Sequence, residues 1–161
     1  EFTMNRMLMD YTRQYYEPLY QRTLQMKEHD FEMAAELATW KKKILNNWNT
    51  IEVISYSLPE SSKQPVCIGN DYHCELVIDI KTLDSEEIGA ELVIAQAATP
   101  GKKQKIFHID EFKFIKKEGS RITFTADTTP SQPGMFDIGI RIFPKHTLLA
   151  HRQELPLVMW I

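Results

Sequence analysis

The segment "HCELVIDIK" (73–81) decides the fold of this chain of 161 residues. Every second side chain from Cys74 to Ile80 is apolar, and the positions between them are mostly polar or charged. A period of two is typical of a β-strand that has one face in a hydrophobic core and the other in water. The segment therefore predicts a half-buried strand of an antiparallel sheet.

Segments of the same kind recur from residue 51 to the end, with Gly, Pro, Asn, Asp or Ser in the gaps between them. Seven short strands in about 110 residues is the density of an immunoglobulin-like antiparallel β-sandwich. The sequence lacks the Cys–Trp–Cys pattern of an antibody domain. The other six predicted strands are "IEVISYSL" (51–58), "GAELVIAQA" (89–97), "KIFHIDEFKFIK" (105–116), "RITFTADT" (121–128), "GMFDIGIRIF" (134–143) and "ELPLVMWI" (154–161).

Before residue 51 the apolar period is helical. Apolar side chains three and four residues apart form a stripe along residues 4–19, which predicts an amphipathic helix. Pro18 predicts a bend in this helix because proline removes a backbone donor, and "EHD" (28–30) predicts a turn before a second helix. We expect an αα-hairpin at 1–50 followed by the β-sandwich at 51–161, an α+β chain that is mainly β.

The two predicted helices carry more large apolar side chains than a lone hairpin can bury. Tyrosine and tryptophan are enriched where protein surfaces meet. Two interpretations stay open: these side chains pack within the chain, or part of the face rests against a domain that this sequence does not contain. In the second case we expect a two-fold homodimer to cover the patch in the isolated chain. The candidate interface residues are Met4, Met7, Leu8, Tyr11, Tyr15, Tyr16, Trp40 and Ile44.

The composition excludes two classes of partner. A net charge of −3 gives no electrostatic footprint for nucleic acid. No apolar run approaches the roughly 20 residues that a membrane-spanning helix needs. The 43% hydrophobic and 25% charged residues are typical of a globular protein in water.

The two cysteines, Cys67 and Cys74, lie seven residues apart around His73. A zinc site needs four ligands in paired spacings, and the remaining histidines are too scattered in the sequence to complete one. We predict no metal site. Reduced thiols in a cytoplasmic protein are the expected state of both cysteines.

No catalytic motif is present: the chain lacks G-x-G-x-x-G, a P-loop, G-x-S-x-G and H-E-x-x-H. The carboxylates at 84–87 and 110–111 fall in predicted turns and at exposed strand positions, and His108 falls in a predicted strand. The connection "FPKHTLLAHRQELP" (143–156) holds Lys145, His146, His151 and Arg152, which either bind an anion or belong to an ordinary solvated loop. We predict no catalytic and no cofactor-binding residue in this chain.

Aromatic side chains on the sandwich offer a different function. An accessory β-sandwich can bind glycans by stacking sugar rings on exposed aromatic rings. The candidates are Tyr56, Tyr72, Phe112 and Phe114. Phe112 and Phe114 are the strongest pair, since residues i and i+2 share one face of a strand; burial of both in the core is the alternative. Trp160, in the last predicted strand, is expected in the core.

Two stretches of the chain resemble the α-glucan (glycogen) phosphorylase family. The stretch "NRMLMDYTRQYY" (5–16) resembles the helix that closes the family's C-terminal nucleotide-binding-like domain and opens with the pattern R-M-x-x-x-Y. The stretch "FDIGIRIFPKHTLLAHRQELPLVMW" (136–160) resembles the β-rich tail of the shorter bacterial and archaeal members, with its G-x-R-x-x-P-x-H motif. The matching residues are Arg6, Met7, Tyr11, Gly139, Arg141, Pro144, His146 and Trp160.

The resemblance implies two Rossmann-like catalytic lobes upstream, which phosphorolyse α-1,4-glucans with pyridoxal phosphate. The family's cofactor-binding lysine motif and phosphate-binding glycine segments have no counterpart in this sequence. We therefore expect a non-catalytic C-terminal region that starts mid-helix at Glu1. It would support the lobes, contact a neighbouring subunit or contact the α-glucan. The alternative is a stand-alone sandwich module that binds a glycan or a protein.

Overall fold

A computed structural model describes residues 4–58, 68–97, 104–131 and 136–161. The chain divides into two compact units, Glu1–Lys43 and Ile44–Ile161, which are described one at a time. Cys67 lies outside the described residues. Within the described parts of the chain, no helix is long and apolar enough to cross a lipid bilayer.

The first unit is helical. Helix α1 (Met4–Tyr11) leads through a π-helical turn, η1 (Thr12–Tyr16), into α2 (Glu17–Asn47). The amide of Glu17 donates to the carbonyl oxygen of Thr12, five residues back, directly before Pro18. A π-turn inserts one extra residue into the helix, and it occurs where proline prevents the regular hydrogen-bond pattern. The predicted irregularity at Pro18 is therefore present, as a π-turn.

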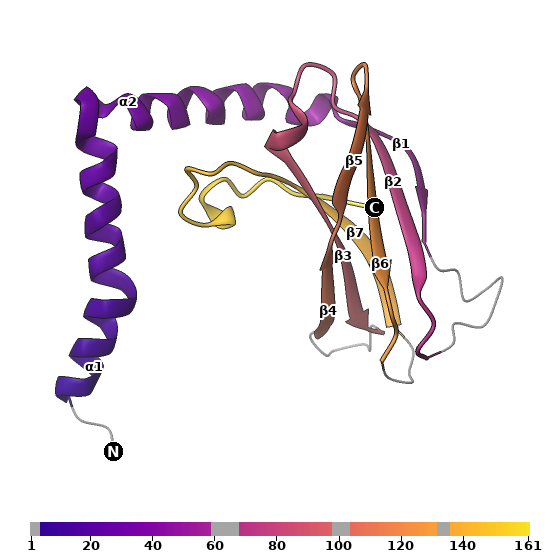
Figure 1. Cartoon of the computed structure of the whole chain (residues 1–161), viewed down its shortest axis with the longest axis horizontal. Helices are drawn as coiled ribbons and strands as arrows, with labels where there is room; N and C mark the ends of the chain where they lie inside the picture. Colours follow the sequence, from indigo (N-terminus) through magenta and orange to yellow (C-terminus); the bar gives the residue numbers. More distant parts are fainter. Residues whose placement is uncertain (1–3, 59–67, 98–103, 132–135) are drawn as a thin grey trace. The chain divides into compact units, whose positions relative to one another are not determined.

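The polar turn also lies where the sequence places it. The backbone leaves the helical conformation from Glu28 to Phe31, with φ values of 49° at His29, 55° at Asp30 and 65° at Phe31. The segments on either side of this turn point in different directions (Figure 1). They do not lie antiparallel and packed together as in the expected αα-hairpin, and no residue of α1 is buried.

The second unit is an antiparallel β-sandwich, as predicted. One sheet has the strand order β1-β2-β6-β5 and the other β4-β3-β7-β8, and every strand pair in both sheets is antiparallel. Figure 1 shows the two sheets facing each other. The strands are β1 (Glu52–Ser57), β2 (Tyr72–Asp79), β3 (Ile88–Gln96), β4 (Ile106–Glu111), β5 (Lys113–Glu118), β6 (Arg121–Thr128), β7 (Phe136–Pro144) and β8 (Met159–Trp160); short 3₁₀ turns are η2 (Trp48–Thr50), η3 (Ser85–Glu87) and η4 (Arg152–Glu154).

The described residues form eight strands where seven were expected, because the single strand predicted at 105–116 is two strands. β4 belongs to one sheet and β5 to the other, and the chain crosses between the sheets at Phe112. The Phe112 side chain is 4% exposed, and its amide donates to the carbonyl oxygen of Ala90 at 2.9 Å. Burial of this ring and this hydrogen bond fix the crossover in place.

The alternating pattern that predicted the sandwich also builds its core. Leu76 and Ile78 of β2 and Ile122 of β6 are completely buried, whereas most of the residues between them are exposed or half-buried. β3 differs, since every residue from Ile88 to Ala95 is buried. It lies between β4 and β7, which is the pattern of a central strand.

Candidate functional site

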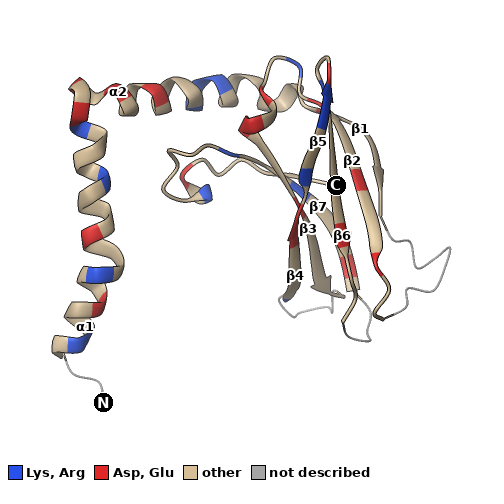
Figure 2. Ribbon diagram, viewed as in Figure 1, with Lys and Arg blue, Asp and Glu red and all other residues tan. Residues whose placement is uncertain are grey.

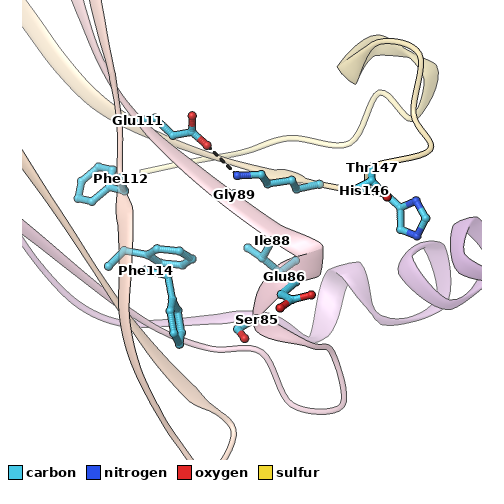
Figure 3. Close-up of a pocket in the computed structure, with 11 residues that line it drawn as sticks. Ser85, Glu86, Ile88, Gly89, Glu111, Phe112, Phe114, His146 and Thr147 are labelled. Atoms are coloured by element: carbon cyan, nitrogen blue, oxygen red, sulfur yellow. Dashed lines mark hydrogen bonds and ion pairs between the residues drawn. The ribbon is translucent and has the colours of Figure 1, made fainter.

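A hollow of about 390 Å³ opens at one end of the sandwich (Figure 3). It receives residues from both sheets, from the turn η3, from the β4–β5 crossover and from the segment that follows β7. This is within the usual size of small-ligand sites. The residues that line it are Ser85, Glu86, Ile88, Gly89, Glu111, Phe112, Phe114, Phe124, Lys145, His146 and Thr147.

The walls of the hollow are held by backbone hydrogen bonds. Asp84 and Glu87 form a reciprocal capping box at η3, in which the Asp84 amide donates to the Glu87 carboxylate at 2.8 Å. The Lys145 amide donates to the carbonyl oxygen of Glu87 at 2.7 Å, which ties the segment after β7 to this turn. The crossover at Phe112 is likewise hydrogen-bonded to β3. Hydrogen bonds thus hold three walls of the hollow in place, and the hollow is pre-formed.

Aromatic rings form one side of the hollow. Phe112 is buried, whereas Phe114 is 48% exposed and packs edge-on against Phe124 with 6.2 Å between ring centroids. Figure 3 shows the Phe114 ring directed toward Ile88 and Glu86. The expectation that Phe112 and Phe114 share one strand face is wrong, because the chain changes sheets between them. Both rings nevertheless line the same hollow.

Polar groups form the rim. The Lys145 ammonium lies 3.0 Å from a Glu111 carboxylate oxygen, and both side chains are more than half exposed. The Nδ1 atom of His146 accepts a hydrogen bond from the Leu148 amide at 3.2 Å. Glu86, also exposed, adds a second carboxylate. The rim thus offers donors and acceptors without an excess of positive charge.

A second polar cluster holds the C-terminal segment on the sheet of β3 and β7. The Glu91 carboxylate, 4% exposed, accepts hydrogen bonds from Arg141 of β7 and from Arg152 of η4. The Arg141 guanidinium also lies 5.6 Å from the centroid of the Trp160 ring, and that of Arg152 lies 4.3 Å from the Phe143 ring. Burial alone would raise the pKa of Glu91, but the hydrogen bonds from the two arginines outweigh it and the pKa is lowered.

Gly139 allows the last residues to approach β7 closely. The amide and carbonyl groups of Ile140 and Ile161 pair reciprocally at 3.0 Å. A Cβ atom on Gly139 would lie 3.3 Å from the Ile161 carbonyl oxygen and 3.7 Å from the Trp160 ring. The G-x-R-x-x-P-x-H motif therefore has structural roles: its glycine leaves room for the terminal strand, and its arginine pairs with Glu91.

A family model decides the classification. The model described as glycogen phosphorylase C-terminal domain matches residues 48–161, which include the whole sandwich. The chain belongs to the glycogen phosphorylase C-terminal domain family. The resemblance seen in residues 136–160 is confirmed by this match.

Two curated relatives extend the similarity of this glycogen phosphorylase C-terminal domain to the helical segment. The maltodextrin phosphorylase of Thermococcus litoralis is 22% identical over 164 residues, which cover 99% of this chain and 18% of the relative. The glycogen phosphorylase of Mycobacterium bovis is 21% identical over 154 residues, covering 96% of this chain and 18% of the relative. The chain thus spans about a fifth of the length of each.

The basic residues of 143–156 do not converge on an anion site in this phosphorylase C-terminal domain. Lys145 pairs with Glu111, and Arg152 pairs with Glu91. His151 caps η4 by accepting from the Gln153 amide at 3.1 Å. The connection is a structured segment whose positive groups have local partners, so the anion-binding alternative loses its support.

Three further polar or aromatic groups have local structural contacts. His108 lies 2.9 Å from Asp110, two residues along the same strand. Burial, followed by nearby aspartates, raises the pKa of the Cys74 thiol to about 11. Trp160 is 55% exposed, which corrects its expected place in the core: β8 is a two-residue strand at the edge of its sheet.

The candidate interface residues of the domain separate into two groups. Trp40 and Ile44 are buried in the structure. The other six are exposed, and the rings of Tyr11 and Tyr15 are 5.8 Å apart. Figure 2 shows both signs of charge along the helices, interleaved with uncharged residues. The residues of the exposed face, called the helix face below, are Met4, Met7, Leu8, Tyr11, Tyr15 and Tyr16.

The sequence pointed to single residues of the hollow and of the Glu91 cluster, but not to the contacts between them. Arg141 and Phe114 were singled out, but Glu91 and Arg152 gave no sign of being partners because 61 residues separate them. Glu91 does stand out as a charged residue within the apolar run "GAELVIAQA". A charge in an otherwise buried strand is the signal that could have indicated a paired carboxylate.

Proposed function

We propose that this chain is the non-catalytic C-terminal region of an α-1,4-glucan phosphorylase-type glycosyltransferase, and that its helix face docks on the catalytic lobes of the same protein. Membership of the family is established by the match to residues 48–161. Support for a larger parent comes from the relatives, of which the chain covers 18%. The docking role rests on the helix face itself.

The observation that carries the docking role is the exposure of large apolar side chains along one short segment. Met4 is 82% exposed, Leu8 60% and Tyr16 61%, and no residue of α1 or η1 is buried. Apolar patches of this kind mark interaction sites. Burying three such side chains contributes about 1.5–3 kcal/mol each, which is enough to hold a domain that is already tethered by the chain.

Pyridoxal phosphate belongs to the parent protein in this proposal and not to this chain. The hollow contains one lysine, Lys145, which is 58% exposed and paired with Glu111. Two carboxylates, those of Glu86 and Glu111, line the space where a phosphate group would require cations. The lining of the hollow therefore does not fit the phosphate group of this cofactor.

Two further parts of the proposal concern the topology and the location. If β1 to β8 are lettered A, B, C, C′, D, E, F and G in chain order, one sheet reads A-B-E-D and the other C′-C-F-G. This strand order supports an immunoglobulin-like assignment of the sandwich. The free thiol of Cys74 is compatible with a cytoplasmic location in carbohydrate metabolism.

Phosphorolysis assays on the purified chain and on its parent protein test the assignment of catalysis. The isolated 161 residues should release no glucose 1-phosphate from maltoheptaose and inorganic phosphate, and should lack a pyridoxal absorbance band. The parent protein should show both. Turnover by the isolated chain would overturn the non-catalytic role.

A stand-alone interaction module is the alternative, in which the helix face forms a homodimer. The exposure of that face is the observation that favours it, because a second copy would cover the same patch by two-fold symmetry. Light scattering on the isolated chain at micromolar concentration distinguishes the outcomes. A dimer that Leu8→Asp dissociates supports self-association through this face, and a dimer that persists in that variant assigns association to another surface.

A further inference from the structure

The geometry points to the hollow at the end of the sandwich as a binding site for a neutral sugar ring, a glucosyl unit of an α-glucan. The chemical class follows from the lining, whereas the choice of an α-glucan rests on the proposed function. The site shares no residue with the helix face, because all its residues belong to the unit Ile44–Ile161.

The aromatic side of the hollow suits the apolar face of a pyranose ring. A pyranose presents C–H groups on its faces and hydroxyl groups around its edge, so it stacks on an aromatic ring while it hydrogen-bonds sideways. Phe114 is 48% exposed and is held edge-on by Phe124, so its ring is both accessible and fixed in orientation. Ile88 and the buried Phe112 extend this apolar floor.

The rim suits hydroxyl groups. The Lys145 ammonium and the Glu111 carboxylate lie 3.0 Å apart, which places a donor beside an acceptor in the hollow. Vicinal sugar hydroxyls can each donate and accept, so a pair of them can bridge to both groups. Because this ion pair is more than half exposed, it contributes little to stability and can exchange partners with a ligand.

The charge of the lining selects a neutral ligand over an anionic one. Two carboxylates, of Glu86 and Glu111, and a single ammonium, that of Lys145, line the hollow. A phosphate or a sugar phosphate would meet net negative charge. The volume of about 390 Å³ is large enough to hold a sugar ring with its substituents.

Titration by two-dimensional ¹H–¹⁵N NMR tests the site in the complete 161-residue chain, with maltoheptaose as the probe. We expect saturable shifts of the Gly89, Phe114 and Thr147 amides with a millimolar dissociation constant, the affinity of a one-ring contact. Phe114→Ala should weaken binding at least about fivefold. Ile115→Ala is the matched control, because Ile115 is 55% exposed on the same strand and does not line the hollow.

Each other outcome has a defined meaning. No saturable shift with any sugar overturns the site and leaves the proposed function, which phosphorolysis by the parent tests, intact. Shifts with cellohexaose and not with maltoheptaose support a sugar site and contradict the α-glucan. Shifts at the same amides with inorganic phosphate alone, or equal weakening by Ile115→Ala and Phe114→Ala, overturn the assignment of the hollow to a neutral sugar.

Discussion

Removal of both arginines from the Glu91 cluster should destabilise the sandwich by more than the sum of the two single substitutions. Arg141→Met leaves the buried carboxylate with Arg152, and Arg152→Met leaves it with Arg141. Each single variant loses the charge-assisted hydrogen bonds of one arginine, while Glu91 keeps the other arginine as a partner. The free energy of unfolding should fall by about 1–2 kcal/mol in each. Arg152 should cost less than Arg141, because its side chain is 51% exposed against 26% for Arg141.

The double variant creates a different situation. The Glu91 side chain is only 4% exposed, so with no guanidinium beside it the carboxylate is buried without a counter-charge. An unpaired buried charge costs about 3–5 kcal/mol, although protonation limits the loss. We therefore expect the double variant to lose at least about 1 kcal/mol more than the two single variants combined. Adding Glu91→Met, which has a similar volume and no charge, should restore about 2 kcal/mol or more.

Urea unfolding measures these differences, with the β-sheet signal in circular dichroism as the probe and equal m-values required for the comparison. Lys116→Met is the matched control, since it removes the exposed Lys116–Glu118 pair and should leave the midpoint unchanged. Additive single losses together with no rescue by Glu91→Met would refute the reasoning. That result would mean that the carboxylate reaches water without its arginines.

Three further predictions follow from local contacts. The fold lowers the pKa of Glu91 from its ordinary value of 4.5. The contribution of this ionised carboxylate to stability is therefore complete above pH 4.5 and is lost as the pH falls through the folded pKa. Urea midpoints at about pH 7 and pH 3 should differ less in Glu91→Met than in the wild type. Gly89→Ala places a Cβ atom 2.5 Å from the Phe143 ring and should cost about 1–3 kcal/mol in the same assay, and Phe143→Leu in the same chain should recover part of that loss. Cys74 is buried with a pKa of about 11, so peptide mapping should find it alkylated by iodoacetamide in urea and protected in the folded chain.

Local periodicity predicted most of the architecture. Alternation over 73–81 and 121–128 identified β2 and β6, because one face of each strand is in the core. Pro18 and the polar residues at 28–30 likewise identified the two irregular places in the helical segment. These features depend on neighbours in the sequence, so the sequence alone reveals them.

The features that were missed depend on contacts between distant residues. The alternating pattern continues through Phe112, so nothing local showed that the chain changes sheets there; the buried ring and the hydrogen bond to Ala90 decide it. Trp160 was expected inside because of its size, but its short strand lies at a sheet edge. The packing of the expected αα-hairpin could not be judged either, since amphipathic helices also cover surfaces of other domains.

The docking of the helix face on the catalytic lobes is tested most directly by calorimetric titration of this chain into the parent protein expressed without these 161 residues. The account predicts a one-to-one complex with a dissociation constant in the micromolar range or tighter, and a higher melting temperature of the lobes. Leu8→Asp with Tyr15→Asp should abolish both effects, whereas Arg13→Glu, outside the helix face as defined, should preserve them. Lobes that bind no chain and melt unchanged, or binding that survives the paired Asp substitutions, would contradict the account.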